Sequence, residues 1–191
     1  MTFQYRLADP DDQGVVIEMA LAFLAESPFG QVFGADPLRL QLLFQDCLRR
    51  GVVVLAEERV TVRGDEHARA VGFIAIMILE EVMSGAPYGE EVAWWVEPDA
   101  RAHRVGAQLL ACAEQWLLTN GATAVKMIAP AGSELDRYYA KQGYVPIETA
   151  YLKRLSHEPV QQTAHDADAA ERSGVSGAGG DLQPDAGTGT R

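Results

Sequence analysis

The chain has 191 residues, of which 48% are hydrophobic and 23% charged, and its formal net charge at pH 7 is −11. This composition suits one globular domain, with or without a tail. The negative charge argues against a general nucleic-acid-binding protein, and the longest apolar run, residues 71–79, is too short to cross a membrane as a helix.

The first expected elements are a short strand at residues 3–8 and two helices. Asp9-Pro10 and Asp36-Pro37 begin the helices, because aspartate caps a helix and proline fits its first turn. Gly51 is expected to follow the end of the second helix. The segment between the helices, Ser27–Asp36, is expected to be a loop.

Three strands follow at residues 52–58, 70–80 and 90–98. A hairpin turn at residues 63–65 is expected to join the first two, and residues 81–89 are expected to form a loop. Glu57 and Glu58 are expected at a strand end in solvent. Trp94 and Trp95 are adjacent on a strand, so they should face opposite sides of the sheet.

The remaining expected elements are a helix with a buried stripe from Val105 to Leu117, a strand at 122–130, a helix from Ser133 to Gln142 and one or two strands at 144–155. Asn120-Gly121 and Gly143 should end the two helices. The order β-α-α-β-β-β-α-β-α-β predicts an α/β fold with a mixed, mostly antiparallel sheet flanked by helices.

From residue 157 to residue 191 the chain is rich in Gly, Ala, Asp, Ser and Thr. Such a segment cannot bury enough apolar surface to offset ordering, so we expect a domain at 1–156 and a disordered tail at 157–191. The tail is either an interaction segment or a solubilising extension.

Cys47 and Cys112 occupy apolar helix positions and are expected to be reduced core residues. Because the start of the chain carries no signal peptide, we expect a cytoplasmic protein. The four histidines are scattered and no Cys-x-x-Cys occurs, so no metal site is expected.

The stretch PDARAHRVGAQLL, residues 98–110, places Arg101, His103 and Arg104 where a strand leads into a helix. Cations are unfavourable at the start of a helix unless an anion is bound. The free N–H groups there bind phosphate readily, and Gly106 and Ala107 are small enough for close approach. The pattern predicts a phosphate or pyrophosphate site, and the alternative is a solvated helix start.

The segment Arg101-Ala-His-Arg104-Val-Gly106 resembles the acetyl-CoA pyrophosphate loop, Arg-x-x-Gly-x-Gly/Ala, of GNAT superfamily N-acetyltransferases, with Arg104 in place of the first glycine. Tyr138-Tyr139-Ala-Lys-Gln-Gly143-Tyr144 is similar to the family segment Leu-Tyr-x-x-x-Gly-Phe. The resemblance covers roughly residues 2–155. It implies a GNAT-like fold and acetyl-CoA as co-substrate, without a metal.

The resemblance also implies roles for particular residues. The cofactor-binding set would be Val96, Arg101, Arg104, Val105, Gly106 and Ala107. Tyr139 matches the tyrosine that protonates the departing CoA thiolate, although the same residue also fits an amphipathic core stripe.

Acetyl transfer to an amine needs a base, because an alkyl ammonium with a pKa of about 10.4 has no lone pair. Glu90 and Glu91 begin the strand before the loop, and alternation points at most one of them inward. Glu91 is favoured, and a solvated charge pair is the alternative. Backbone N–H groups around Val96 are the expected oxyanion donors.

Phe29 and Tyr88 lie in segments expected to contact the acceptor, and Glu26 and Asp36 could attract a cationic amine. Together these features predict an acetyl-CoA-dependent N-acetyltransferase acting by direct attack of a primary amine, on a small molecule, a peptide or a protein. The alternative is a non-catalytic acyl-CoA-binding or regulatory module of the same fold. The resemblance is compatible with a homodimer.

Overall fold

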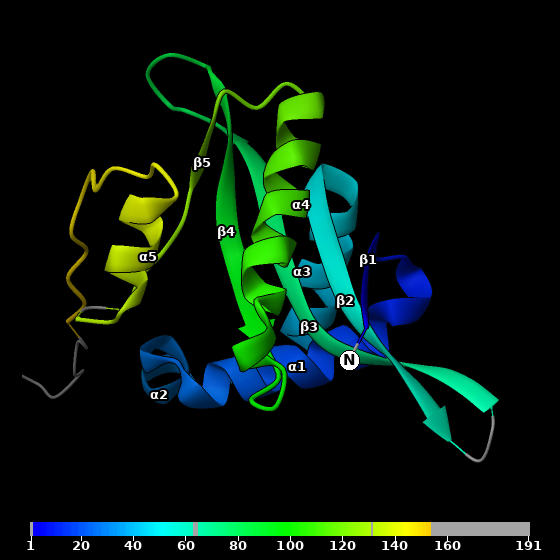
Figure 1. Cartoon of the computed structure of the whole chain (residues 1–191). Coiled ribbons are helices and arrows are strands. Elements are labelled where there is room, and N and C mark those ends of the chain that lie inside the picture. Colours follow the sequence, from blue (N-terminus) through cyan, green and yellow to red (C-terminus); the bar gives the residue numbers. More distant parts are fainter. Residues whose placement is uncertain (1, 63–64, 131, 154–191) are drawn as a thin grey trace, which may run out of the picture. The chain divides into compact units, whose positions relative to one another are not determined.

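The computed structural model describes residues 2–62, 65–130 and 132–153 (Figure 1). Its elements in chain order are β1 (Phe3–Leu7), a 3-10 helix η1 (Pro10–Asp12), α1 (Gln13–Glu26), α2 (Pro28–Phe33), α3 (Pro37–Arg50), β2 (Gly51–Val62), β3 (Asp65–Glu80), β4 (Pro87–Val96), a 3-10 helix η2 (Arg101–His103), α4 (Val105–Thr119), β5 (Ala124–Lys126) and α5 (Leu135–Lys141). The predicted tail and turn residues 63 and 64 lie outside the described residues.

The five strands form one sheet in the order β1-β2-β3-β4-β5. The first three pairings are antiparallel, and β4 pairs with β5 in parallel. Parallel neighbours need a crossover connection, which α4 provides between β4 and β5. The predicted α/β class with a mixed, mostly antiparallel sheet is therefore confirmed.

The two faces of the sheet carry separate hydrophobic clusters, because side chains alternate along each strand. Val52 and Val54 of β2 pack in one cluster with residues of α4. Val53 and Leu55 pack in the other cluster with residues of α1 and α3. Helix α4 therefore covers one face, and α1 and α3 cover the opposite face (Figure 1).

The predicted helix starts are confirmed by their caps. The Asp9 carboxylate accepts from the Asp11 N–H at 2.8 Å, and the Asp36 carboxylate accepts from the Leu38 N–H at 3.0 Å. Each cap binds a donor that the first turn of a helix leaves unpaired.

The loop predicted at Ser27–Asp36 is wrong, because this segment contains the helix α2. The Ser27 hydroxyl accepts from the Phe29 N–H at 3.2 Å, and Pro28 stands in the first turn. A serine cap followed by proline is a helix start, and the shortness of the helix concealed its period.

The strands predicted at 144–155 are absent from the described part of this segment, residues 144–153. Val145 and Ile147 are 75% and 73% exposed, and Pro146 has no N–H to donate to a ladder. The preceding strand is also shorter than predicted, since β5 covers Ala124–Lys126. An ion pair joins the two segments instead, with Lys126 Nζ 2.6 Å from Glu148 Oε1.

Helix α5 begins at Leu135, and Glu134 rather than Ser133 occupies its N-cap position. Ser133 instead closes a turn, because its N–H donates to the Pro130 carbonyl at 3.0 Å. Gly143 has a φ of +89°, a conformation that favours glycine after a helix, as predicted.

The solvent position predicted for Glu57 and Glu58 is also wrong, because β2 continues past both residues. Glu57 accepts from the Arg6 guanidinium at 2.6 Å. Glu58 is only 6% exposed and accepts from Arg69 at 2.9 Å. Both carboxylates therefore pair with arginines of neighbouring strands.

Both cysteines are free thiols. Cys47 is 1% exposed in the cluster under α3, which agrees with the prediction of a core residue. Cys112 is only partly buried, next to the cluster under α4.

Candidate active site

A β-bulge lies in the middle of β4. Ala75 of β3 pairs with Ala93, and the next residue, Ile76, pairs with Glu91, so Val92 is an extra residue. Val92 and Ala93 both pack with the cluster under α1 and α3. The bulge therefore interrupts the alternation of side chains next to Glu91.

Beyond the bulge the two tryptophans face opposite sides of the sheet, as predicted. Trp95 is buried among residues of α1 and α3, and Trp94 packs with residues of α4. Trp94 also lies near two rings of α5, at 6.1 Å from Tyr138 and 6.3 Å from Tyr139 between ring centroids.

The outer edge of β4 is open past its midpoint, because the pairing with β5 ends at Glu90 and Lys126 in the described residues. The Val96 carbonyl does not pair with β3 and accepts from Arg101 Nε at 2.9 Å. The N–H and C=O of one residue point to the same side of an antiparallel strand. The Val96 N–H is therefore directed to this open edge.

Glu91 and Tyr139 meet at the backbone of Ile128, just after β5. The Glu91 carboxylate accepts from the Ile128 N–H at 2.9 Å, and the Tyr139 hydroxyl donates to the Ile128 carbonyl at 3.4 Å. Two side chains from β4 and α5 are thus brought to one residue of a third segment.

The surroundings of Glu91 and Tyr139 set their protonation. Burial raises the pKa of Glu91 to about 7, against the smaller opposing effect of the Ile128 N–H. Burial, with the nearby Glu91 and Tyr138, raises the pKa of the Tyr139 hydroxyl well above its ordinary value. Near neutral pH, Glu91 can accept a proton while Tyr139 keeps its own.

Glu90 has different surroundings from Glu91. It accepts from the Tyr88 hydroxyl at 3.0 Å and lies 3.5 Å from Lys126 Nζ. Tyr88 belongs to β4, which begins at Pro87 rather than at Glu90 as predicted. Of the two predicted carboxylates, only Glu91 is placed beside Tyr139.

The start of α4 is formed by an unusual residue. Arg104 has φ 60° and ψ 18°, and it is the only non-glycine residue with positive φ in the part of the chain that the structure describes. The Gln108 N–H donates to the Arg104 carbonyl at 3.1 Å. The N–H groups of Val105, Gly106 and Ala107 precede this first bond, so they have no acceptor within the helix.

Arg101 and His103 contact other parts of the fold. The Arg101 guanidinium lies 3.2 Å from Glu26 at the end of α1, and its carbon is 4.6 Å from the centroid of the Trp95 ring. The His103 ring lies 5.8 Å from that of Phe3. Arg101 therefore ties α1 to the end of β4 while lining the groove described below.

Gly106 is small for a reason that the sequence did not indicate. A Cβ atom at this position would lie 3.0 Å from Cζ2 of Trp94, which is closer than side chains normally approach. Val105, another predicted cofactor-binding residue, is completely buried and does not line the groove described below.

A groove of about 960 Å³ runs between the start of α4, the end of β4 and α5. This volume is in the upper part of the range of small-molecule sites. The groove collects predicted cofactor-binding residues: Val96, Arg101, Arg104, Gly106 and Ala107. The predicted substrate-binding residues Phe29, which is 51% exposed on α2, and Tyr88 do not line it.

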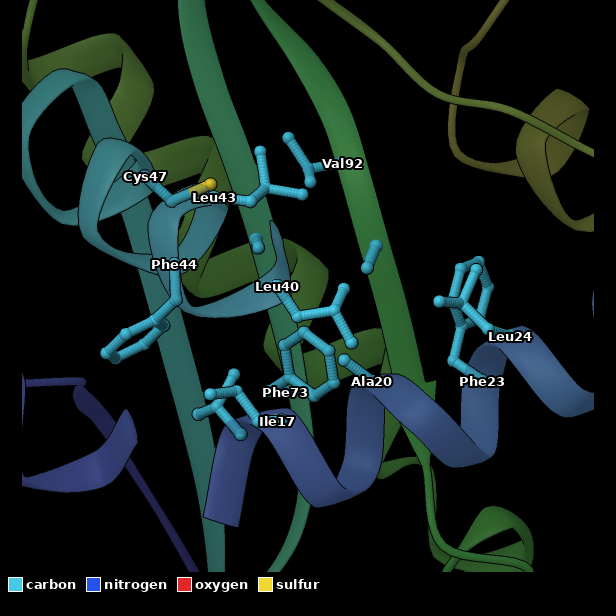
Figure 2. A pocket seen from close by; sticks show the side chains of 13 residues that line it. Ile17, Ala20, Phe23, Leu24, Leu40, Leu43, Phe44, Cys47, Phe73 and Val92 are labelled. Carbon is cyan, nitrogen blue, oxygen red and sulfur yellow. The ribbon is translucent and has the colours of Figure 1, made fainter. Parts of the chain in front are cut away.

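Sequence reasoning missed two features: the role of Ile128 and an apolar cavity beside Val92 (Figure 2). Both lie near the bulge of β4 and the point where the β4–β5 pairing ends. Among the described residues, no group of histidine, cysteine and carboxylate side chains could hold a metal ion. No helix in that part is long and apolar enough to cross a membrane.

A family model described as acetyltransferase (GNAT) family matches residues 19–144 of the chain. No curated protein matches its sequence. Similar solved structures include a ribosomal-protein-alanine N-acetyltransferase from Brucella melitensis biovar Abortus 2308, which is 18% identical with a TM-score of 0.60, over 81% of this chain and 100% of that one.

Glucosamine-6-phosphate N-acetyltransferase from Arabidopsis thaliana is 16% identical with a TM-score of 0.58. An aminoglycoside acetyltransferase from an uncultured soil metagenomic sample is 15% identical with a TM-score of 0.61. Each comparison covers 82% of this chain and 100% of the other. At these identities the solved structures show a shared fold.

Proposed function

The chain belongs to the acetyltransferase (GNAT) family, and from this premise we propose that it transfers an acetyl group from acetyl-CoA to the nitrogen of a primary amine by direct attack. The observation that carries the proposal is the pair formed by Glu91 and Tyr139 at Ile128. A proton acceptor and a proton donor lie there beside the open edge of β4.

The groove at the start of α4 binds acetyl-CoA, the acetyl donor. The N–H groups of Gly106 and Ala107 and the positive end of the helix dipole hold the diphosphate. The Arg104 side chain lines the same groove and adds a charge-assisted hydrogen bond. Arg101 contributes mainly by holding the loop, since its guanidinium already binds Val96 and Glu26.

Glu91, or a water that it holds, accepts the proton that the amine must lose. An alkyl ammonium has a pKa of about 10.4, so a base is needed on or before attack. The raised pKa of Glu91, about 7, makes the carboxylate a better proton acceptor than an ordinary one while leaving much of it ionised at neutral pH.

The amine nitrogen then bonds to the thioester carbon, and the Val96 N–H stabilises the oxyanion that forms. The carbon–sulfur bond breaks, and Tyr139 gives its proton to the departing thiolate. The Tyr139 hydroxyl is protonated at neutral pH and can donate to the sulfur, although its raised pKa makes it a weaker acid than an ordinary phenol. Holding both reactants at one edge of β4 supplies much of the rate.

Calorimetric titration with acetyl-CoA, combined with a free-thiol release assay over a panel of primary amines, tests this proposal. Binding together with amine-dependent thiol release is the expected result. Binding without release from any amine would instead favour the non-catalytic acyl-CoA-binding module. Absence of binding would contradict both functions.

We also propose that residues 1–156 form the catalytic domain and that residues 157–191 are not needed for it. The described residues up to Ala150 belong to one compact unit. Deleting residues 157–191 should leave the melting temperature and thiol release nearly unchanged, and a large drop in either would contradict this boundary.

A further inference from the structure

A second cavity lies on the face of the sheet opposite to α4, between α1, α3, β3 and β4 (Figure 2). Its volume is about 90 Å³. Apolar side chains form its walls, among them Phe23 of α1, Leu40 and Leu43 of α3, and Phe73 of β3. None of the described residues that line it carries a charge.

The cavity adjoins the bulge of β4, next to Glu91 along the chain. Val92 and Ala93 both line it, and Glu91 directly precedes them. The pairing with β5 has ended by this point, so no described strand separates the cavity from the outer edge of β4. An amine whose apolar substituent lies in the cavity can therefore place its nitrogen at the edge where Glu91 and the Val96 N–H lie.

The cavity also opens toward solvent. Leu43, which forms part of the wall, is 36% exposed, and Val92 is only partly buried. Protein interiors are close-packed and contain few voids. An apolar cavity with a partly exposed wall is therefore typical of a small ligand-binding site.

Carboxylates that could have received a cationic acceptor are engaged elsewhere. Glu26 binds Arg101 at 3.2 Å, and Asp36 accepts from the Leu38 N–H at 3.0 Å at the start of α3. A second ammonium or a hydroxyl group inside the cavity would lose water without gaining a partner.

We propose that this cavity binds the apolar substituent of the acceptor, so that the substrate class is a primary amine with an alkyl group of roughly four carbons. The size follows from the cavity volume, since an apolar cavity of about 150 Å³ holds benzene. This inference rests on the proposed transfer to an amine and adds the chemistry of the rest of that amine.

The test measures binding directly, on the full chain saturated with CoA, by calorimetry with ethylamine, propylamine, butylamine and 1,4-diaminobutane. Affinity should rise about fourfold with each methylene up to butylamine. Diaminobutane, which has the same length and a second charge, should bind at least about tenfold more weakly than butylamine.

A matched pair of variants tests whether the dependence of affinity on alkyl length arises in the cavity. Leu43→Phe narrows the entrance and should lower butylamine affinity about tenfold with little effect on ethylamine. Leu42→Phe changes the neighbouring residue, which is 49% exposed and does not line the cavity, and should change neither affinity.

Thiol release from the same amines separates this inference from the proposed function. Binding in the expected order without thiol release would support the cavity assignment and contradict the proposed catalysis. Equal affinity for butylamine and diaminobutane would overturn the inference, even if another amine were acetylated. So would equal effects of the two variants. If Leu43→Phe fails to fold, the amine series with the unaltered chain decides.

Discussion

Glu91 and Tyr139 bind opposite ends of the same residue, with the Glu91 carboxylate on the Ile128 N–H at 2.9 Å and the Tyr139 hydroxyl on the Ile128 carbonyl at 3.4 Å. Neither side chain is close to the other in sequence. Ile128 therefore fixes the positions of the proposed base and the proposed acid at the place where β4 and β5 cease to pair.

Replacing Glu91 by glutamine should lower kcat by about 10²-fold or more, because proton transfer by a positioned base typically contributes that much. Glutamine keeps an oxygen that can accept from the Ile128 N–H, so the fold should persist. Glu90→Gln is the control, since Glu90 binds Tyr88 and Lys126 instead. Steady-state thiol release measures kcat of both variants. An equal loss of kcat in the two would exclude Glu91 as the base.

The pH dependence of kcat/KM should show a rise through about pH 7, where the Glu91 carboxyl loses its proton and becomes a base. In Glu91→Gln this rise should vanish and leave only the ionisation of the amine at higher pH. A rise near pH 7 that persists in the variant would assign it to another group.

The free energy of unfolding should fall with rising pH, whereas kcat/KM should rise. The folded pKa of Glu91, about 7, exceeds the ordinary value of 4.5. The folded state therefore holds a proton that the unfolded state releases, and the associated stability is lost as pH rises from 4.5 through 7. Relative to the original chain, Glu91→Gln should gain about 1–3 kcal/mol of unfolding free energy between pH 4 and 8, measured by urea titration.

Tyr139→Phe should lower kcat at least about tenfold and leave the Kd for acetyl-CoA nearly unchanged. The substitution removes the proposed proton donor and its bond to Ile128 but keeps the ring, whose packing includes Tyr144 at 5.3 Å. Tyr138→Phe, one residue away in the groove, serves as the control. If kcat is the same in Tyr139→Phe and Tyr138→Phe, Tyr139 has only a packing role.

Arg104→Gly should raise the unfolding free energy by about 1 kcal/mol, because a left-handed backbone strains any residue with a Cβ. Arg104→Ala keeps that strain and should show no such gain. Both variants lose the guanidinium, so both should bind acetyl-CoA several-fold more weakly at low salt. Unchanged affinity in both would exclude Arg104 from the binding site.

Gly106→Ala should destabilise the fold by about 1 kcal/mol or more, since the added methyl meets Trp94 at 3.0 Å. Gly14→Ala in α1, where the added Cβ would meet no side chain and no other segment within 4 Å, should instead be neutral or stabilising. Adding Trp94→Phe to Gly106→Ala should recover part of the loss, and a purely additive double variant would argue against this contact.

The order of most elements and the start of α4, where we propose the diphosphate site, could be predicted because they depend on local signals. Caps such as Asp9 and Asp36 identify helix starts, and alternation placed Trp94 and Trp95 on opposite faces. The same signals failed for α2, whose single cap at Ser27 precedes too few residues to show a helical period.

The geometry around Glu91 could not be read from the sequence, because the bulge at Val92 breaks the alternation that would otherwise assign faces. Ile128 carries no side-chain chemistry, and its role comes from backbone atoms placed by long-range pairing. The pairing of Arg101 with Glu26 likewise joins residues 75 positions apart.

The most direct test of the account is a crystal structure of the full chain with CoA. The account predicts the diphosphate against the N–H groups of Gly106 and Ala107, and the sulfur within hydrogen-bond distance of the Tyr139 hydroxyl. A diphosphate bound elsewhere, or a groove closed by the Arg104 side chain, would contradict it.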